Sequence, residues 1–193
     1  MLLYLTVIFI SIAIISVVNI FLSPELSLSF AVNTVLSVSA GAVAVIAIDG
    51  TVAFIIRRLT PTSWFSADNK IFKVSKKERD FYRSLKIKSW KNSIPELGGF
   101  TNFHKDKLES TNDRQYLERF ILESNYGVVI HLANAALGFG VMFIPFCSSP
   151  GIWIPVYSVN FILSILPVAV LRYTSYTLQN LYARSSEIAK IHC

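Results

Sequence analysis

The sequence predicts an all-α integral membrane protein with four transmembrane helices and an amphipathic cytoplasmic segment between the second and the third. The first observation is composition: 53% of the 193 residues are hydrophobic and only 16% are charged, whereas a soluble domain carries roughly 25% charged residues. The second is charge position. All 18 Lys and Arg lie in residues 57–119 or 172–190, and residues 127–171 contain no Asp, Glu, Lys or Arg. Such segregation is typical of membrane spans separated by a charged domain, and it argues against a soluble enzyme and a nucleic-acid-binding protein.

The first two spans are predicted at residues 1–22 and 29–56. The first run is long enough to cross a hydrocarbon core of ~30 Å at about 1.5 Å per residue. A cleaved signal peptide is the rival interpretation, but no basic region precedes the run. The second run follows a short turn and ends at the basic pair Arg57-Arg58. It is rich in small residues, which let helix backbones approach closely: Ser37, Ser39, Ala40, Gly41, Ala42, Ala44 and Ala47.

The other two spans are predicted at about residues 127–147 and 152–171, with a Ser-Ser-Pro-Gly turn between them. Four spans with short connections on one side place the basic segments on the other side. The positive-inside rule assigns that side to the cytoplasm. We therefore expect a multi-pass cell-membrane protein with both termini cytoplasmic. Hydropathy divides the chain into spans one and two (1–56), a membrane-surface segment (57–126), spans three and four (127–171) and a cytoplasmic tail (172–193).

The segment 57–126 is basic and rich in aromatic residues. Its Ser75-Lys76-Lys77-Glu78 stretch predicts a capping box, in which Ser75 accepts the backbone N–H of Glu78 and the Glu78 side chain reaches back. Residues 111–126 predict an amphipathic helix that runs into the third span. Because the segment lacks a self-sufficient core, we expect it to lie on the inner membrane surface.

Three residues are candidate catalytic groups. Asp49 is the only acid inside a predicted span, and intramembrane acids usually mark a pathway or a site; the alternative is an interfacial acid satisfied by a neighbouring Lys or Asn. His131 suits general-base catalysis because imidazole titrates near neutrality. Its alternative role is a hydrogen bond to a neighbouring span, through Asn160 or Tyr157. Glu123 lies about 12 Å from His131 along a helix, so the two can border one pocket without touching.

The candidate substrate-binding residues lie near the same predicted inner boundary. Arg172 ends the fourth span, where it either anchors the helix at the interface or holds an anionic headgroup bidentately. The full set is Arg172, Tyr173, Trp90, Lys91 and Asn160. The sequence contains no P-loop, nucleophile elbow or metal-ligand cluster, so we expect no metal and no bound cofactor.

Several of these residues also carry a family resemblance. Residues 85–95 (LKIKSWKNSIP) resemble the V/I-K-x-W-K element of the glycosyl-4,4′-diaponeurosporenoate acyltransferase family, small bacterial membrane proteins of the staphyloxanthin pathway. Glu123 and His131 resemble its E-T-x-x-A-E-x-x-H stretch. The final span of this sequence resembles that of the family at five residues, which are Tyr157, Asn160, Pro167, Arg172 and Tyr173. The resemblance covers about residues 50–178.

Departures from the family pattern leave two functions open. One departure is that Asn160 and Pro167 are further apart than the family's pair. Val128 stands where the family has a second acid, and residues 171–178 lack two of its arginines. The resemblance implies a membrane-embedded acyltransferase that moves a fatty acyl group from acyl-CoA or another acyl thioester onto a lipid or glycolipid hydroxyl at the inner leaflet. The alternative is a non-catalytic membrane protein that binds or translocates a lipid, or regulates a membrane partner. Membrane lipids are partners in both cases, and the oligomeric state is open.

The polar candidates suggest one shared site. Asp49, Glu123, His131 and Arg172 all map near the cytoplasmic ends of their spans, and burial in one cavity would let them satisfy one another. We expect Trp90 and Lys91 to cover that cavity.

Overall fold

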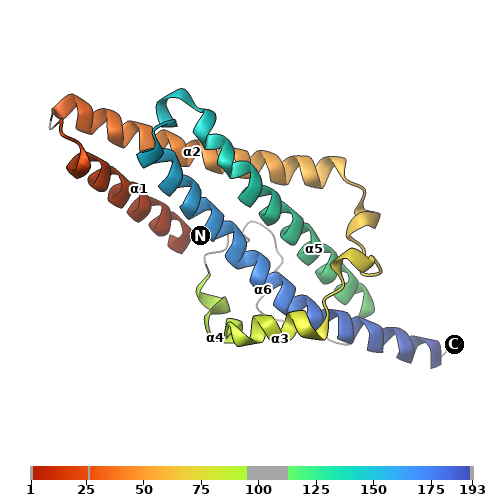
Figure 1. Cartoon of the computed structure of the whole chain (residues 1–193). Helices are drawn as coiled ribbons and strands as arrows, with labels where there is room; N and C mark the ends of the chain where they lie inside the picture. The colour runs from red at the N-terminus through yellow and green to blue at the C-terminus, as the bar shows by residue number, and fades with distance from the viewer. Residues whose placement is uncertain (1, 26, 95–112, 192–193) are drawn as a thin grey trace. The chain divides into compact units, whose positions relative to one another are not determined.

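A computed structural model describes residues 2–25, 27–94 and 113–191 (Figure 1). Within these ranges the chain is helical with short connections and contains no strand, which confirms the all-α prediction. The α-helices are α1 (Leu2–Leu22), α2 (Leu28–Leu59), α3 (Lys76–Ser84), α4 (Ile87–Trp90), α5 (Arg114–Leu137) and α6 (Pro150–Ile191). Short 3₁₀ turns occupy Thr62–Phe65, Lys70–Phe72, Lys91–Ser93, Gly138–Phe143 and Pro145–Cys147. Residues 95–112 of the predicted membrane-surface segment, including the first residues of its second helix, lie outside the described part.

Four helical stretches are long and apolar enough to cross a membrane, as predicted. They are Leu2–Leu22, Leu28–Leu59, Arg114–Phe143 and Pro150–Ser185. Large apolar side chains stand exposed on them: Phe9 is 67% exposed and Phe21 79%. In water such surfaces would be costly, whereas hydrocarbon accepts them without cost. These faces therefore suit contact with lipid.

The third and fourth stretches differ in detail from the hydropathy prediction. α5 begins where the Asp113 carboxylate accepts the backbone N–H groups of Gln115 and Tyr116, a typical N-cap. It then runs unbroken to Leu137, which confirms the prediction that the amphipathic helix runs into the third span. The α-helix becomes 3₁₀ at Gly138, because glycine is a poor helix former. The tail after residue 171 is also helical, as the continuation of α6.

Contacts divide the chain into two compact units. Among the described residues, unit 1 comprises residues 2–25, 27–54 and 132–165, and unit 2 comprises residues 55–94, 113–131 and 166–191. The helices α2, α5 and α6 contribute to both. This division groups residues by contact, a different criterion from the hydropathy segments, and it places more than half of α6, from Leu166 onward, with the basic segment.

Unit 1 is packed through small and apolar side chains. Its core contains Val38, Val45, Val141, Cys147 and Val156. A Cβ added at Gly41 would lie 3.3 Å from the Cys147 sulfur, so the small residue of α2 does permit a close approach. The Cys147 thiol donates to the Ser37 carbonyl at 3.3 Å, and this free, buried cysteine is a packing residue.

Unit 2 is packed through aromatic side chains. Leu117, Phe120 and Ile121 of α5 bury against Leu178 and Tyr182 of α6. The Phe65 ring, from the 3₁₀ turn after α2, stacks on Tyr126 with centroids 3.8 Å apart. The basic segment therefore packs into a hydrophobic core that it forms together with α5 and α6.

The capping box at α3 forms by half. The Ser75 hydroxyl accepts the Glu78 N–H at 3.1 Å, as predicted. The expected return bond from the Glu78 carboxylate to Ser75 is wrong, because both carboxylate oxygens bond to Arg172 instead. A guanidinium fork is a stronger partner for a carboxylate than one backbone N–H.

Candidate functional site: a basic hollow beside an ion-paired arginine

Arg172 is the centre of the polar network of unit 2. Its guanidinium forms a bidentate pair with Glu78, with N–O distances of 2.8 and 2.9 Å, and also donates to the Phe72 carbonyl at 2.9 Å. The Arg172 side chain is 15% exposed and that of Glu78 is 28% exposed. The sequence predicts that Arg172 either binds an anionic headgroup or anchors the helix at the interface. In the structure its partner is instead the carboxylate of Glu78.

The same stretch of α6 holds the α3 region at further points. The Gln179 amide donates to the Phe72 carbonyl at 2.9 Å and accepts the Val74 N–H at 3.0 Å. The Arg79 guanidinium lies over the Tyr176 ring, 4.8 Å from its centroid, a cation–π contact. Gln179 lies two helical turns after Arg172, so the two side chains share one face of α6. This spacing is the sequence signal from which Gln179 could have been predicted.

Tyr82 of α3 borders this network. Burial raises the pKa of its phenol above the ordinary value, and the negative charge of Glu78 adds to that rise while the positive charge of Arg172 opposes it. The phenol is therefore neutral at physiological pH and able to donate a hydrogen bond.

An open hollow of about 500 Å³ lies beside the network. It is lined by Arg83, Lys86, Lys88, Ser89 and Tyr173. Tyr173 was a predicted binding residue, and the structure brings it together with three cations of the α3–α4 region. The prediction did not include Arg83, Lys86, Lys88 or Ser89. The last three lie in the family-like stretch 85–95, from which the prediction takes only Trp90 and Lys91 as site residues.

Trp90 and Lys91 lie just after this hollow in the chain. The Trp90 indole donates to the Leu85 carbonyl at 2.9 Å, which ties the ring to its own turn. Lys91 is half-buried in the 3₁₀ turn that follows. Their role as a cover remains a prediction.

Glu123 belongs to a second ion pair in unit 2. It accepts from Arg57 at 2.8 Å, and the same guanidinium lies over the Tyr126 ring, 5.3 Å from its centroid. The Arg57 side chain is 46% exposed. Glu123 and Arg172, expected to share one cavity, thus each have a different charged partner. His131, two turns further along α5, is half-buried.

In unit 1, Asp49 and Asn160 are the predicted site residues. One carboxylate oxygen of Asp49 is buried and has no hydrogen-bond partner among the described residues, and Tyr4 lies within its electrostatic reach. The Lys or Asn partner that the alternative interpretation requires is therefore absent from the described part. Asn160 is buried, donates to the Asn134 carbonyl at 3.3 Å and lies against Gly138.

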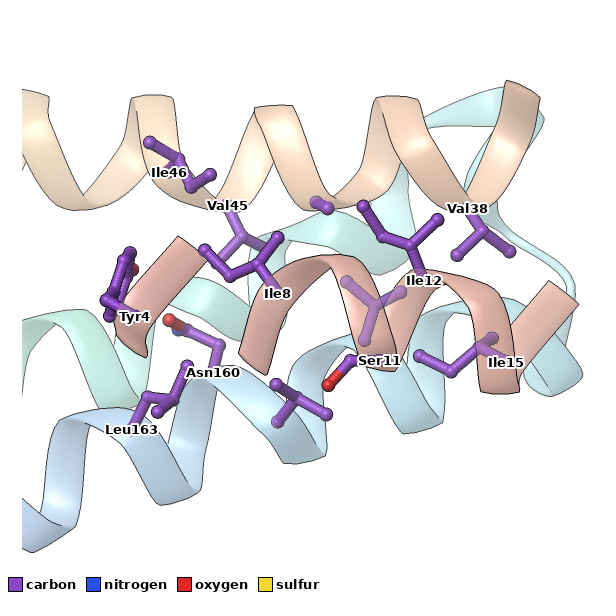
Figure 2. Close-up of a pocket in the computed structure, with 13 residues that line it drawn as sticks. Tyr4, Ile8, Ser11, Ile12, Ile15, Val38, Val45, Ile46, Asn160 and Leu163 are labelled. Atoms are coloured by element: carbon purple, nitrogen blue, oxygen red, sulfur yellow. The ribbon is translucent and has the colours of Figure 1, made fainter. Parts of the chain in front are cut away.

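A narrow apolar crevice of about 40 Å³ lies in unit 1 among α1, α2 and α6 (Figure 2). Figure 2 shows Ile8 of α1 facing Val45 of α2, with Asn160 projecting from α6. The crevice is smaller than the ~150 Å³ apolar cavity that accepts benzene. It suits the edge of an alkyl chain lying along the helices rather than an enclosed ligand.

The family comparison matches the part of the chain that contains most of these residues. A family model described as glycosyl-4,4′-diaponeurosporenoate acyltransferase matches residues 61–184. The chain belongs to this family. Membership in this acyltransferase family implies an acyltransferase in carotenoid biosynthesis. No curated protein and no solved structure matches the chain.

Among the site residues, the acyltransferase family match includes Glu123, His131, Asn160 and Arg172, and it also spans the whole basic hollow. Asp49 lies before the matched range.

Proposed function

We propose that this protein is a membrane-embedded acyltransferase that moves a fatty acyl group from an acyl thioester onto a lipid or glycolipid hydroxyl at the inner leaflet. The observation that carries the proposal is the acyltransferase family match over residues 61–184. The apolar crevice and the exposed apolar helices support a substrate that stays in the membrane.

The proposed reaction is a direct acyl transfer. The acceptor hydroxyl oxygen attacks the thioester carbonyl carbon while a base removes the hydroxyl proton. The tetrahedral intermediate collapses as the carbon–sulfur bond breaks, the proton passes to the departing thiolate, and an ester and a free thiol leave. No external oxidant or reductant is needed.

His131 is the proposed base, because imidazole accepts and returns a proton near neutral pH. Glu123, held by Arg57 at 2.8 Å, is a proposed acidic neighbour of the acceptor. Asp49 is a separate candidate in unit 1, since its unpartnered oxygen can accept a hydrogen bond from a hydroxyl. Arg172 is a positioning residue, because its fork is engaged by Glu78.

The test is acyl transfer by the reconstituted full chain. Liposomes containing the protein are given an acyl-CoA and extracted bacterial glycolipids, and mass spectrometry detects acceptors that gain one acyl chain. His131→Gln should lower kcat by at least ~100-fold, the usual contribution of a general base. Leu132→Ala, at a neighbouring 47% exposed position, is the control and should retain activity.

A non-catalytic lipid-binding or regulatory protein is the second candidate. It is favoured by Val128, which replaces an acid of the family pattern, and by the ion pairs that engage Glu123 and Arg172. Absence of any acylated product, with every lipid class and a folded protein, would overturn the acyltransferase proposal and favour this candidate.

A further inference from the structure

The hollow beside α3 and α4 gathers positive charge in one place. Arg83 and Lys86 lie at the end of α3 and the turn after it, while Lys88 and Ser89 belong to α4. Tyr173 of α6 completes the lining. The lining residues that the structure describes therefore offer three cations, two hydroxyls and an aromatic ring, and none of them is an acid.

The backbone of this hollow is held in an uncommon conformation. Lys86 has a φ of 53° and is the one described non-glycine residue with positive φ. Such a conformation is unfavourable for a residue other than glycine and persists only where its surroundings fix it. Helices commonly end with a residue in this conformation, and here it sets the direction in which the chain turns from α3 to α4.

Four hydrogen bonds and one buried side chain fix the turn. The Lys86 N–H donates to the Arg83 carbonyl at 3.0 Å, and the Lys86 carbonyl accepts from the Ser89 N–H at 2.9 Å and its hydroxyl at 2.7 Å. The Trp90 indole bonds to the Leu85 carbonyl at 2.9 Å. Ile87, between the cations, is fully buried. The cations thus project from a fixed frame.

The opposite wall is fixed by the Arg172 network. Tyr173 follows Arg172 directly, and Arg172 clamps α3 to α6 through Glu78. The two walls of the hollow are therefore held together by a bidentate ion pair within unit 2. This preorganisation reduces the conformational entropy that a ligand would have to remove.

We propose that this hollow binds the phosphates of a coenzyme A thioester, with Arg83, Lys86 and Lys88 on the phosphate oxygens and Tyr173 against the adenine. Charge number favours this ligand over a lipid headgroup, because three cations in one hollow match several phosphate charges and a phosphodiester headgroup carries one. The volume of about 500 Å³ falls in the ~300–1,000 Å³ range of ligand pockets. Aromatic rings are common stacking partners of bases.

This inference names the acyl donor of the proposed function and rests on that function for the donor role alone. Binding of coenzyme A is measured without turnover, so the two proposals fail separately. If the protein binds coenzyme A, loses that binding in the hollow variants and shows no transferase activity, the proposed binding site is supported and the proposed acyl transfer is overturned. If acyl transfer occurs and the KM for the donor is unchanged in those variants, the proposed acyl transfer is supported and the proposed binding site is overturned.

The experiment uses the full chain in phosphatidylcholine nanodiscs, with equilibrium binding of coenzyme A and of 3′-dephospho-coenzyme A. Arg83→Gln and Lys88→Gln should each weaken coenzyme A binding roughly tenfold, as expected for loss of one charge-assisted contact. The 3′-dephospho analogue should bind more weakly than coenzyme A. Both affinities should fall with rising salt.

The matched control is Lys76→Gln and Lys77→Gln, two exposed lysines at the start of α3 that do not line the hollow. They change net charge equally and should leave coenzyme A binding within twofold. Thermal unfolding of each variant checks that it is folded. Equal weakening by the control lysines would overturn the proposal, since it would indicate non-specific charge attraction.

A second arm separates the donor from a lipid. Nanodiscs containing phosphatidylglycerol should leave coenzyme A binding largely unchanged if the hollow takes the nucleotide. Strong competition by phosphatidylglycerol, lost in Arg83→Gln, would assign the hollow to a lipid headgroup and overturn the donor proposal. Transfer supported by an acyl carrier protein, with no binding of coenzyme A, would overturn it as well.

Discussion

The helices within unit 1 and the helices within unit 2 are held together by different kinds of contact. In the described residues of unit 1, helices meet through small side chains and single neutral hydrogen bonds, such as Cys147 to the Ser37 carbonyl and Asn160 to the Asn134 carbonyl. In unit 2 they meet through two ion pairs, three cation–π contacts and stacked aromatic rings. The difference follows the two solvents that the sequence predicts, hydrocarbon and the interface with water.

In hydrocarbon, apolar surface gives no drive for helices to associate, so close packing and a few hydrogen bonds hold them. Charges there are expensive, and Asp49 is the single exception in the described part of unit 1 outside its connecting turn. In unit 2, water lowers the cost of charge, and long side chains can bridge helices. We therefore expect unit 2 to bind charged groups such as phosphates and unit 1 to contact the apolar chains of lipids.

The largest effect should come from breaking the partly buried ion pair of unit 2. Arg172→Met leaves the Glu78 carboxylate without its fork and the Phe72 carbonyl with one donor fewer. We expect a loss of about 2–3 kcal/mol of unfolding free energy, less than for a fully buried pair because Glu78 is partly exposed. Thermal unfolding in detergent measures it.

The double variant Arg172→Met/Glu78→Gln sharpens this result. Removing the second charge takes away the uncompensated carboxylate, so the double variant should be more stable than Arg172→Met alone. A double variant that is equally unstable would show that shape, rather than charge pairing, holds α3 on α6.

The next effect tests close packing in unit 1. Gly138→Ala adds a methyl group that runs into the Asn160 amide, and such overpacking should cost about 1–3 kcal/mol. Gly50→Ala is the matched control, since a Cβ there meets nothing within 4 Å. Because alanine is the better helix former, Gly50→Ala should stabilise by up to about 1 kcal/mol. Equal effects of the two changes on the melting temperature would contradict the packing account.

The smallest effect should come from the exposed ion pair. Arg57→Ala removes the contact with Glu123 and the cation over Tyr126, and we expect a loss below about 1 kcal/mol because the arginine is 46% exposed. The loss should shrink further in high salt. A salt-independent loss as large as that of Arg172→Met would remove the distinction between the two pairs.

The site was less predictable than the spans. Arg172, Tyr173 and Glu123 were identified as polar residues at span ends, and the structure places all three in unit 2 with Arg172 and Glu123 in separate ion pairs. Glu78 had been assigned to a local capping box, because a short-range pattern was the only partner visible in the sequence. Arg83 carried no pattern that distinguished it from other surface cations.

The sequence by itself determined that four helices are apolar enough to span a membrane and that the positive charge lies in two segments, because transfer free energy depends on composition and needs no knowledge of neighbours. Only the tertiary structure decided which groups meet. Glu78 and Arg172 are 94 positions apart, and helix periodicity specifies the face on which a side chain lies but not the helix that lies against that face. The strained turn at Lys86 was decided in the same way, because a left-handed lysine is unfavourable locally and is kept only by the hydrogen bonds and the buried Ile87 around it.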